Sequence, residues 1–209
     1  MNVQVLPLAI TMMAGPQIMS AIIFVTALKP LRLSLTFLAG AAIGSTVGVA
    51  VTFTLASVLG NSVSLGDPSN NGSLGEIIQY LLVALLVFLA IKNYVRRETI
   101  EPPRWLGALQ NAKPGTAFTT GLLLLSVFPS DFVVLVTVGV NLAQNNASLL
   151  AAVPFLALTL LIAALPLLFY LLFRRRAQRL MPKVRAWMNA NSWLINIIVY
   201  LIFIGLILA

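Results

Sequence analysis

The sequence predicts an all-α integral membrane protein with six transmembrane helices, and three observations support this fold class. Of the 209 residues, 60% are hydrophobic and only 9% are charged, whereas soluble domains average about 25% charged residues. Six apolar stretches each reach the roughly 20 residues that an α-helix needs to cross a bilayer. All 13 lysines and arginines cluster around three of the short connections between these stretches, as is typical of the cytoplasmic side of a membrane.

The six spans follow one another with short connections. The basic connections join the first span to the second, the third to the fourth and the fifth to the sixth, so the positive-inside rule places both termini outside. No basic residue precedes Lys29, so we expect an uncleaved first helix. In chain order the predicted spans cover about 5–28, 33–60, 74–95, 116–141, 149–173 and 190–208.

The residue types exclude several functional classes. The chain has no cysteine and no histidine, which removes disulfides, thiolate or imidazole metal sites and histidine acid–base catalysis. We therefore expect no metal, no cofactor and no enzymatic activity. The net charge of +8 would suit a nucleic-acid binder, but the basic residues lie beside apolar spans, where they set topology. We expect no nucleic-acid partner.

The spans divide into two halves of three, 1–97 and 116–209, joined by a cytoplasmic linker at 98–115 within one transmembrane domain, 1–209. Because each half contains an odd number of spans, the second half enters the membrane in the opposite orientation. The sequence thus predicts a 3+3 inverted repeat, an architecture found in many secondary transporters.

A proline lies near the middle of the first span of each half: Pro16, which follows Gly15, and Pro129. Proline removes a backbone donor and clashes with the carbonyl four residues earlier, so we expect helices 1 and 4 to be broken. Lipid cannot satisfy the polar groups that a break frees. Matched breaks in inverted halves indicate a midplane binding site; prolines that only bend their helices are the alternative.

Asp131 is the only charged residue deep inside a predicted span, and no lysine or arginine lies at comparable depth. Placing a charge there costs about 2.5–3.5 kcal/mol or more. We expect Asp131 either to load and unload a proton or to line a wet cavity opposite a cationic group; a neutral acid that joins two helices is the structural alternative. Ser130, Gln17 and Asn196 are polar residues that would contact the same cavity or link helices.

Two further patterns each have two interpretations. Gly40, Gly44 and Gly48 leave one face of the second span nearly bare, which favours close helix packing within the bundle or across a homodimer. A basic run between the fifth and sixth spans either anchors the topology or lies on anionic lipid headgroups as an amphipathic segment. Its basic residues are Arg174, Arg175, Arg176, Arg179, Lys183 and Arg185.

Several stretches carry a family resemblance that covers most of the chain. They are Gly15-Pro16-Gln17-Ile18, Phe37-Leu38-Ala39-Gly40 with Gly44, and, most specifically, Pro102 to Leu109 followed by Lys113 to Phe118. Together they resemble the GAP family, also called the sulfolipid-1-addressing proteins, of the LysE transporter superfamily. Related proteins often have an Asn-Pro-Lys-Asn-like break, whereas this chain has Phe128-Pro129-Ser130-Asp131, which keeps the proline and changes its polar neighbours.

The resemblance implies a LysE-like fold and a plasma-membrane exporter, or an export accessory, that moves a cell-envelope glycolipid or another amphipathic solute outward. Export of small cations or amino acids is the second hypothesis, because the superfamily includes such exporters. The third is a non-transporting scaffold that docks a lipid-export pump through the glycine face. The expected partners are accordingly membrane lipids, an envelope glycolipid, a second copy of the chain and a lipid-export pump.

Overall fold

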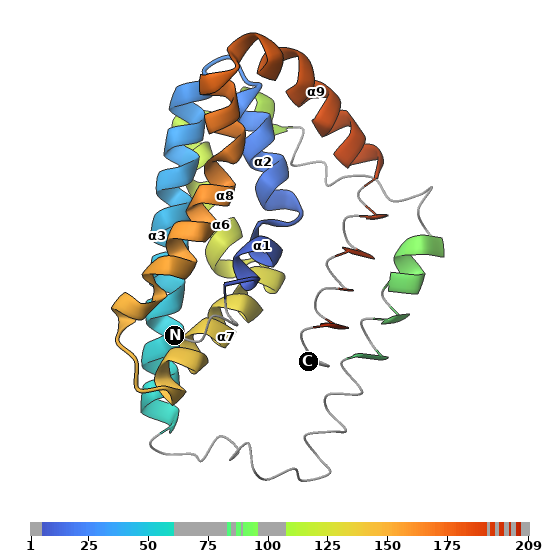
Figure 1. Ribbon diagram of the computed structural model, residues 1–209. Helices are drawn as coiled ribbons and strands as arrows, with labels where there is room; N and C mark the ends of the chain where they lie inside the picture. Colours follow the sequence, from blue (N-terminus) through green and yellow to red (C-terminus); the bar gives the residue numbers. More distant parts are fainter. Residues whose placement is uncertain are drawn as a thin grey trace. The chain divides into compact units, whose positions relative to one another are not determined.

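The computed structural model describes residues 6–60, 83–84, 87–88, 90–95, 108–191, 193–194, 197–198, 201 and 204–205 (Figure 1). This part of the chain is all-helical and contains no strand. The chain forms two compact units, one of residues 1–63 and 103–186 and the other of residues 64–102 and 187–209. Both proline breaks belong to the first unit.

Two helices among the described residues are long and apolar enough to cross a membrane. The helix α3 covers Pro30–Gly60, and α8 covers Val153–Leu172 after the short 3₁₀ turn η3 at Leu149–Ala152. Their apolar spans run from Pro30 to Val58 and from Leu149 to Leu172, which matches two of the predicted spans. Apolar helices of this length are those of a membrane protein.

Two other predicted spans are each divided into two helices. The first consists of α1, Leu8–Met13, and α2, Pro16–Val25. The fourth consists of α6, Pro114–Val127, and α7, Pro129–Gln144, which together form a third candidate span if the bent pair counts as one. The spans predicted at 74–95 and 190–208 fall largely outside the described residues, so the count of six and the inverted repeat stay predictions.

The glycine face of α3 packs on α6 and α7 of the same chain (Figure 1). A Cβ atom at Gly40 would collide with the backbone of Phe118, and one at Gly44 would lie 2.5 Å from the backbone oxygen of Leu122. Gly48 faces a leucine side chain of α7. The structure therefore shows packing within the bundle at this face, while a homodimer stays a prediction.

The partner helices contribute glycines of their own to the same contact. Gly121 of α6 lies against the backbone of Phe37, and Gly139 of α7 lies against Thr52 of α3. The Thr52 hydroxyl also donates a hydrogen bond of 2.9 Å to the backbone oxygen of Leu135. Such close backbone approach maximises van der Waals contact, which is what holds helices together in lipid.

The outer surface of α3 differs from the packed face. It exposes large apolar side chains, each more than two-fifths accessible in the isolated chain. Hydrocarbon, rather than water, is the solvent that suits such a surface. These side chains are Leu35, Ile43, Val47, Val51 and Leu55.

The helix α9, Arg174–Ala190, contains the basic run. The run is therefore helical, as the amphipathic interpretation requires, although contact with lipid stays a prediction. Its residue Ala177 is fully buried in a cluster with Val25, Leu167 and Tyr170, which fixes the start of α9 on α2 and α8.

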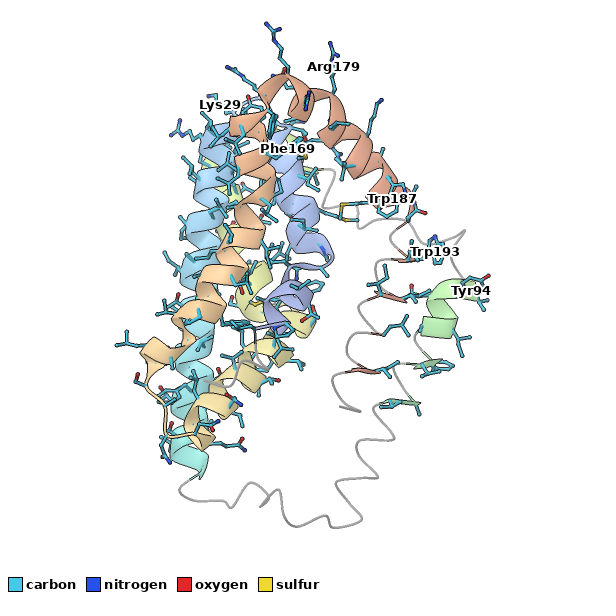
Figure 2. The ribbon with its side chains drawn as sticks, viewed as in Figure 1. Lys29, Tyr94, Phe169, Arg179, Trp187 and Trp193 are labelled. Carbon is cyan, nitrogen blue, oxygen red and sulfur yellow. The ribbon has the colours of Figure 1, made fainter. Side chains whose placement is uncertain are left out.

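The second unit is described at a few positions. Among them, the rings of Tyr94 and Trp193 meet edge to face with their centroids 5.9 Å apart (Figure 2). Edge-to-face packing is a favourable arrangement for aromatic rings, so this contact joins the two sequence segments that make up the unit.

Candidate functional site: two helix breaks joined by a buried acid

The first break lies between α1 and α2. Gly15 has φ +108° and ψ −137°, a conformation that glycine adopts readily and other residues rarely do. Pro16 then opens α2, where its missing N–H would have no helical partner in any case. The helix predicted to break at Pro16 is thus broken, and Gln17 lies in the first turn of the new helix, fully buried.

The second break lies between α6 and α7. Phe128 has ψ +132°, an extended conformation that ends α6, and Pro129 opens α7. The two helical pieces, 114–127 and 130–144, are inclined to each other by 59°. Asp131 consequently lies in the first turn of α7, where the helix dipole favours negative charge.

Proline alone does not account for these breaks. Pro166 lies inside the uninterrupted helix α8, although it too lacks the backbone donor that a regular helix uses. What distinguishes Pro16 and Pro129 is that the residue before each has left the helical conformation.

The two breaks meet at a buried hydrogen bond. Gln17 Nε2 donates to Asp131 Oδ2 over 2.7 Å, linking residues that are 114 positions apart. The hydroxyl of Ser130 donates to Asp131 Oδ1 over 3.1 Å. Gln17 and Asp131 are both inaccessible to solvent. The structure therefore brings together three of the four polar residues singled out in the sequence; the fourth, Asn196, lies outside the described residues.

The amide of Gln17 uses only its donor group. Its oxygen, Oε1, is buried and has no hydrogen-bond partner among the described residues. A half-turn of the amide would bring Oε1 to Asp131, where it would accept a hydrogen bond from a protonated carboxyl group. The pair can therefore satisfy Asp131 with or without a proton.

Asp131 has no companion for metal binding in the described part of the chain, which contains no group of three or more acidic, histidine or cysteine side chains. A single carboxyl group held by an amide and a hydroxyl suits the transfer of one proton, or contact with one cationic group, as well as a purely structural link between helices.

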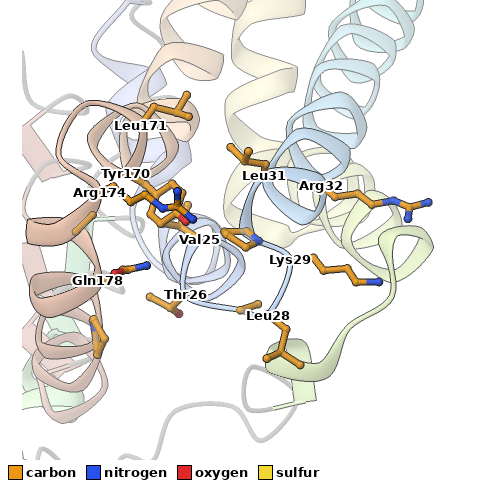
Figure 3. A pocket seen from close by; sticks show the side chains of 14 residues that line it. Val25, Thr26, Leu28, Lys29, Leu31, Arg32, Tyr170, Leu171, Arg174 and Gln178 are labelled. Carbon is orange, nitrogen blue, oxygen red and sulfur yellow. The ribbon is translucent and has the colours of Figure 1, made fainter.

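A cavity of about 710 Å³ lies at the other end of α2. The turn from α2 into α3 forms one wall, and the end of α8 with the start of α9 forms the other (Figure 3). Of the six basic residues singled out between the fifth and sixth spans, only Arg174 lines it. Lys29 and Arg32, the two basic residues of the connection between the first and second spans, line it too.

Replacing Gly15 by alanine should lower the melting temperature. The nearest atom to an added Cβ, Gln17 Oε1, lies at 3.5 Å, so there is room for a methyl group. The cost is instead the backbone strain of a positive φ, about 1–3 kcal/mol. Thermal unfolding in detergent measures it, with Gly115→Ala as the control, because nothing lies within 4 Å of a Cβ at Gly115. A Gly15→Ala protein as stable as the native protein would contradict the strained break.

Comparison with known proteins gives one result. A family model described as Sap, sulfolipid-1-addressing protein, matches residues 5–209. No curated protein and no solved structure matches the chain. The matched range contains both helix breaks, the Gln17–Asp131 hydrogen bond and the cavity.

Proposed function

Because this chain belongs to the sulfolipid-1-addressing protein family, whose name links it to lipid export or addressing, we propose that it is a membrane transporter or export accessory. It moves a cell-envelope glycolipid or another amphipathic solute outward, driven by proton exchange at Asp131. The observation that carries the proposal is the buried hydrogen bond between Gln17 and Asp131, because it places an ionisable group where two broken helices meet.

The hydrogen bond provides a physical link between protonation and conformation. A carboxylate accepts a charge-assisted hydrogen bond from Gln17, which is roughly twice as strong as a neutral one. A proton on Asp131 replaces this bond by a weaker one to Gln17 Oε1. Protonation would thus loosen the attachment of α2 to α7, and a difference in interaction between two states is what shifts a conformational equilibrium.

The proposal includes the wider architecture. Broken helices that open each half of an inverted repeat are typical of secondary transporters, in which one repeat moves against the other around a central site. We accordingly propose the 3+3 arrangement of the LysE superfamily and a plasma-membrane location with both termini outside. The broken first and fourth spans support this architecture, and the one-sided lysines and arginines support the orientation.

The test uses the full chain in sealed vesicles with a fluorescent anionic glycolipid and an imposed pH difference. The native protein should move the lipid between leaflets at a rate that depends on pH, and Asp131→Asn should remove that dependence. Thr137→Val is the matched control, because Thr137 is exposed on the same helix and its hydroxyl bonds only to its own backbone, at Val133. Equal pH dependence in the native and Asp131→Asn proteins would refute proton coupling through this residue.

The same vesicles separate the alternatives. Export of small cations or amino acids predicts flux of these solutes without movement of lipid. A non-transporting scaffold predicts neither, and the glycine face proposed to dock a pump already contacts α6 and α7. We therefore propose membrane lipids and an envelope glycolipid as the principal partners.

A further inference from the structure

We propose that the cavity between the α2–α3 turn and the α8–α9 junction binds the anionic headgroup of a lipid, with the acyl chains along the leucines at its rim. Binding at this cavity does not depend on transport. That the bound lipid is the transported cargo rests on the function proposed above.

The charge of the cavity selects an anion. Lys29, Arg32 and Arg174 line it, and none of the 14 described lining residues is acidic. Figure 3 shows Arg174 and Gln178 on the α8–α9 wall, and Lys29 and Arg32 on the wall formed by the turn and the start of α3. In Figure 3 the side chains of Lys29 and Arg32 extend away from the α8–α9 wall. Their charge would attract an anion to the cavity, and the two side chains would have to turn inward to touch it. Arginine matches the oxygens of a phosphate or sulfate group with two parallel donors.

The apolar side chains around the cavity distinguish a lipid from a free anion. Leu28 is 92% exposed, and Leu31 and Leu171 are also exposed, although all three line the cavity. Leucine side chains make no favourable contact with a free phosphate or sulfate ion. They give hydrocarbon chains a surface next to the headgroup, as in protein segments that lie at a membrane interface.

The inner wall of the cavity is firmly built. Val25, Tyr170 and Ala177 line it and belong to the buried cluster that fixes the start of α9. The guanidinium carbon of Arg174 lies 6.0 Å from the centre of the Tyr170 ring, at the limit of a cation–π contact. The Tyr170 ring is thus one contact that orients the Arg174 side chain at the cavity.

The volume fits a headgroup larger than a single phosphate. Pockets that hold small molecules measure about 300–1,000 Å³, and this one measures about 710 Å³. A sugar or glycerol unit that carries one phosphate or sulfate would fit inside. We therefore assign the ligand to the class of anionic lipids, which includes headgroups that carry a phosphate and headgroups that carry a sulfate.

The experiment measures binding of fluorescent phosphatidylglycerol to the full chain in nanodiscs of phosphatidylcholine. The test variant carries Lys29→Gln, Arg32→Gln and Arg174→Gln. The control carries Arg175→Gln, Arg179→Gln and Lys183→Gln, which remove the same charge from residues outside the cavity lining. The cavity variant should bind at least about tenfold more weakly than the native protein, because it loses all three cations that line the cavity. The control keeps these three cations and should change about twofold or less.

Two outcomes would overturn the proposal. An equal loss in both triple variants would mean that only the overall positive charge attracts the lipid. Displacement of the lipid by inorganic phosphate or sulfate at the concentration effective for a short-chain phosphatidylglycerol would mean that the site takes a free anion. Leu28→Ser supplies an independent readout, because it should weaken lipid binding in a variant that keeps every charge and the buried cluster.

The outcomes for the cavity and for the proposed function are separable. Asp131→Asn should bind phosphatidylglycerol within about twofold of the native protein, because Asp131 does not line the cavity and the amide oxygen that replaces the carboxyl group can still accept the hydrogen bond from Gln17. If the native protein binds phosphatidylglycerol but shows no pH-dependent movement of lipid, the proposed headgroup site stands and the proposed transport function is wrong. If the cavity variant still moves lipid and still binds phosphatidylglycerol as the native protein does, the proposed transport function stands and the proposed headgroup site is wrong.

Discussion

Replacing Gly121 by valine is expected to cause a large loss of folded protein. A Cβ atom at this position would collide with the backbone oxygen of Phe37 and lie 2.9 Å from the backbone nitrogen of Ala41. Overpacking costs about 1–3 kcal/mol where side chains can move aside. Here both obstacles are backbone atoms of a long helix, so α6 and α3 must separate along their contact, and the cost should exceed that range.

Size-exclusion profiles and thermal unfolding in detergent would measure the effect. Gly115→Val is the matched control, because Gly115 lies near the start of the same helix and no atom lies within 4 Å of an added Cβ. Valine has a higher intrinsic helix propensity than glycine at either site, so a loss of stability at Gly121 alone would identify packing as the cause. A Gly121→Val protein with the same melting temperature as Gly115→Val would contradict the close contact between α6 and α3.

Replacing Gln17 by leucine should produce the second large effect, a loss of about 1–3 kcal/mol, because it removes the donor from a buried carboxyl group. The double variant Gln17→Leu/Asp131→Leu should be more stable than the sum of the two single changes predicts, since neither of the two buried positions then carries a polar group that has lost its partner at the other. Interaction energies of this kind reach about 0.5–3 kcal/mol for residues in direct contact.

Denaturant unfolding of the four proteins in the cycle would measure the interaction. Thr159→Val is a suitable control: Thr159 is fully buried, but its hydroxyl bonds to Phe155 of its own helix, so its loss should show no coupling to Asp131. Additive effects of the changes at Gln17 and Asp131 would mean that the hydrogen bond contributes nothing to the fold.

The positions of the helix breaks could be predicted from the sequence because the chemistry of proline is local. The rule was incomplete, since Pro166 remains inside a helix. The sequence also does not show which residues of the two breaks face each other. Gln17 follows its proline by one residue and Asp131 by two, so the alignment of the two segments does not pair them. Their contact depends on how α2 packs against the helices around it.

The glycine contact and the cavity show the same limit. The spacing of Gly40, Gly44 and Gly48 was visible, but Gly121 and Gly139, which lie on the other side of the contact, stand in no such series. Their only signal was a position within an apolar span. The cavity was missed because its charges come from two distant connections, and only the prediction that basic connections share one side of the membrane could have joined them.

The short helix α2 has a mechanical consequence. It is 10 residues long, or about 15 Å at the α-helical rise, with no proline or glycine after its first turn. Gln17 lies at one end, and Val25 and the following turn line the cavity at the other. Such a helix moves as a rigid body, so a displacement of one end also displaces the other. A headgroup that displaced the turn would shift Gln17 against Asp131, and a change in that hydrogen bond would reshape the cavity in return.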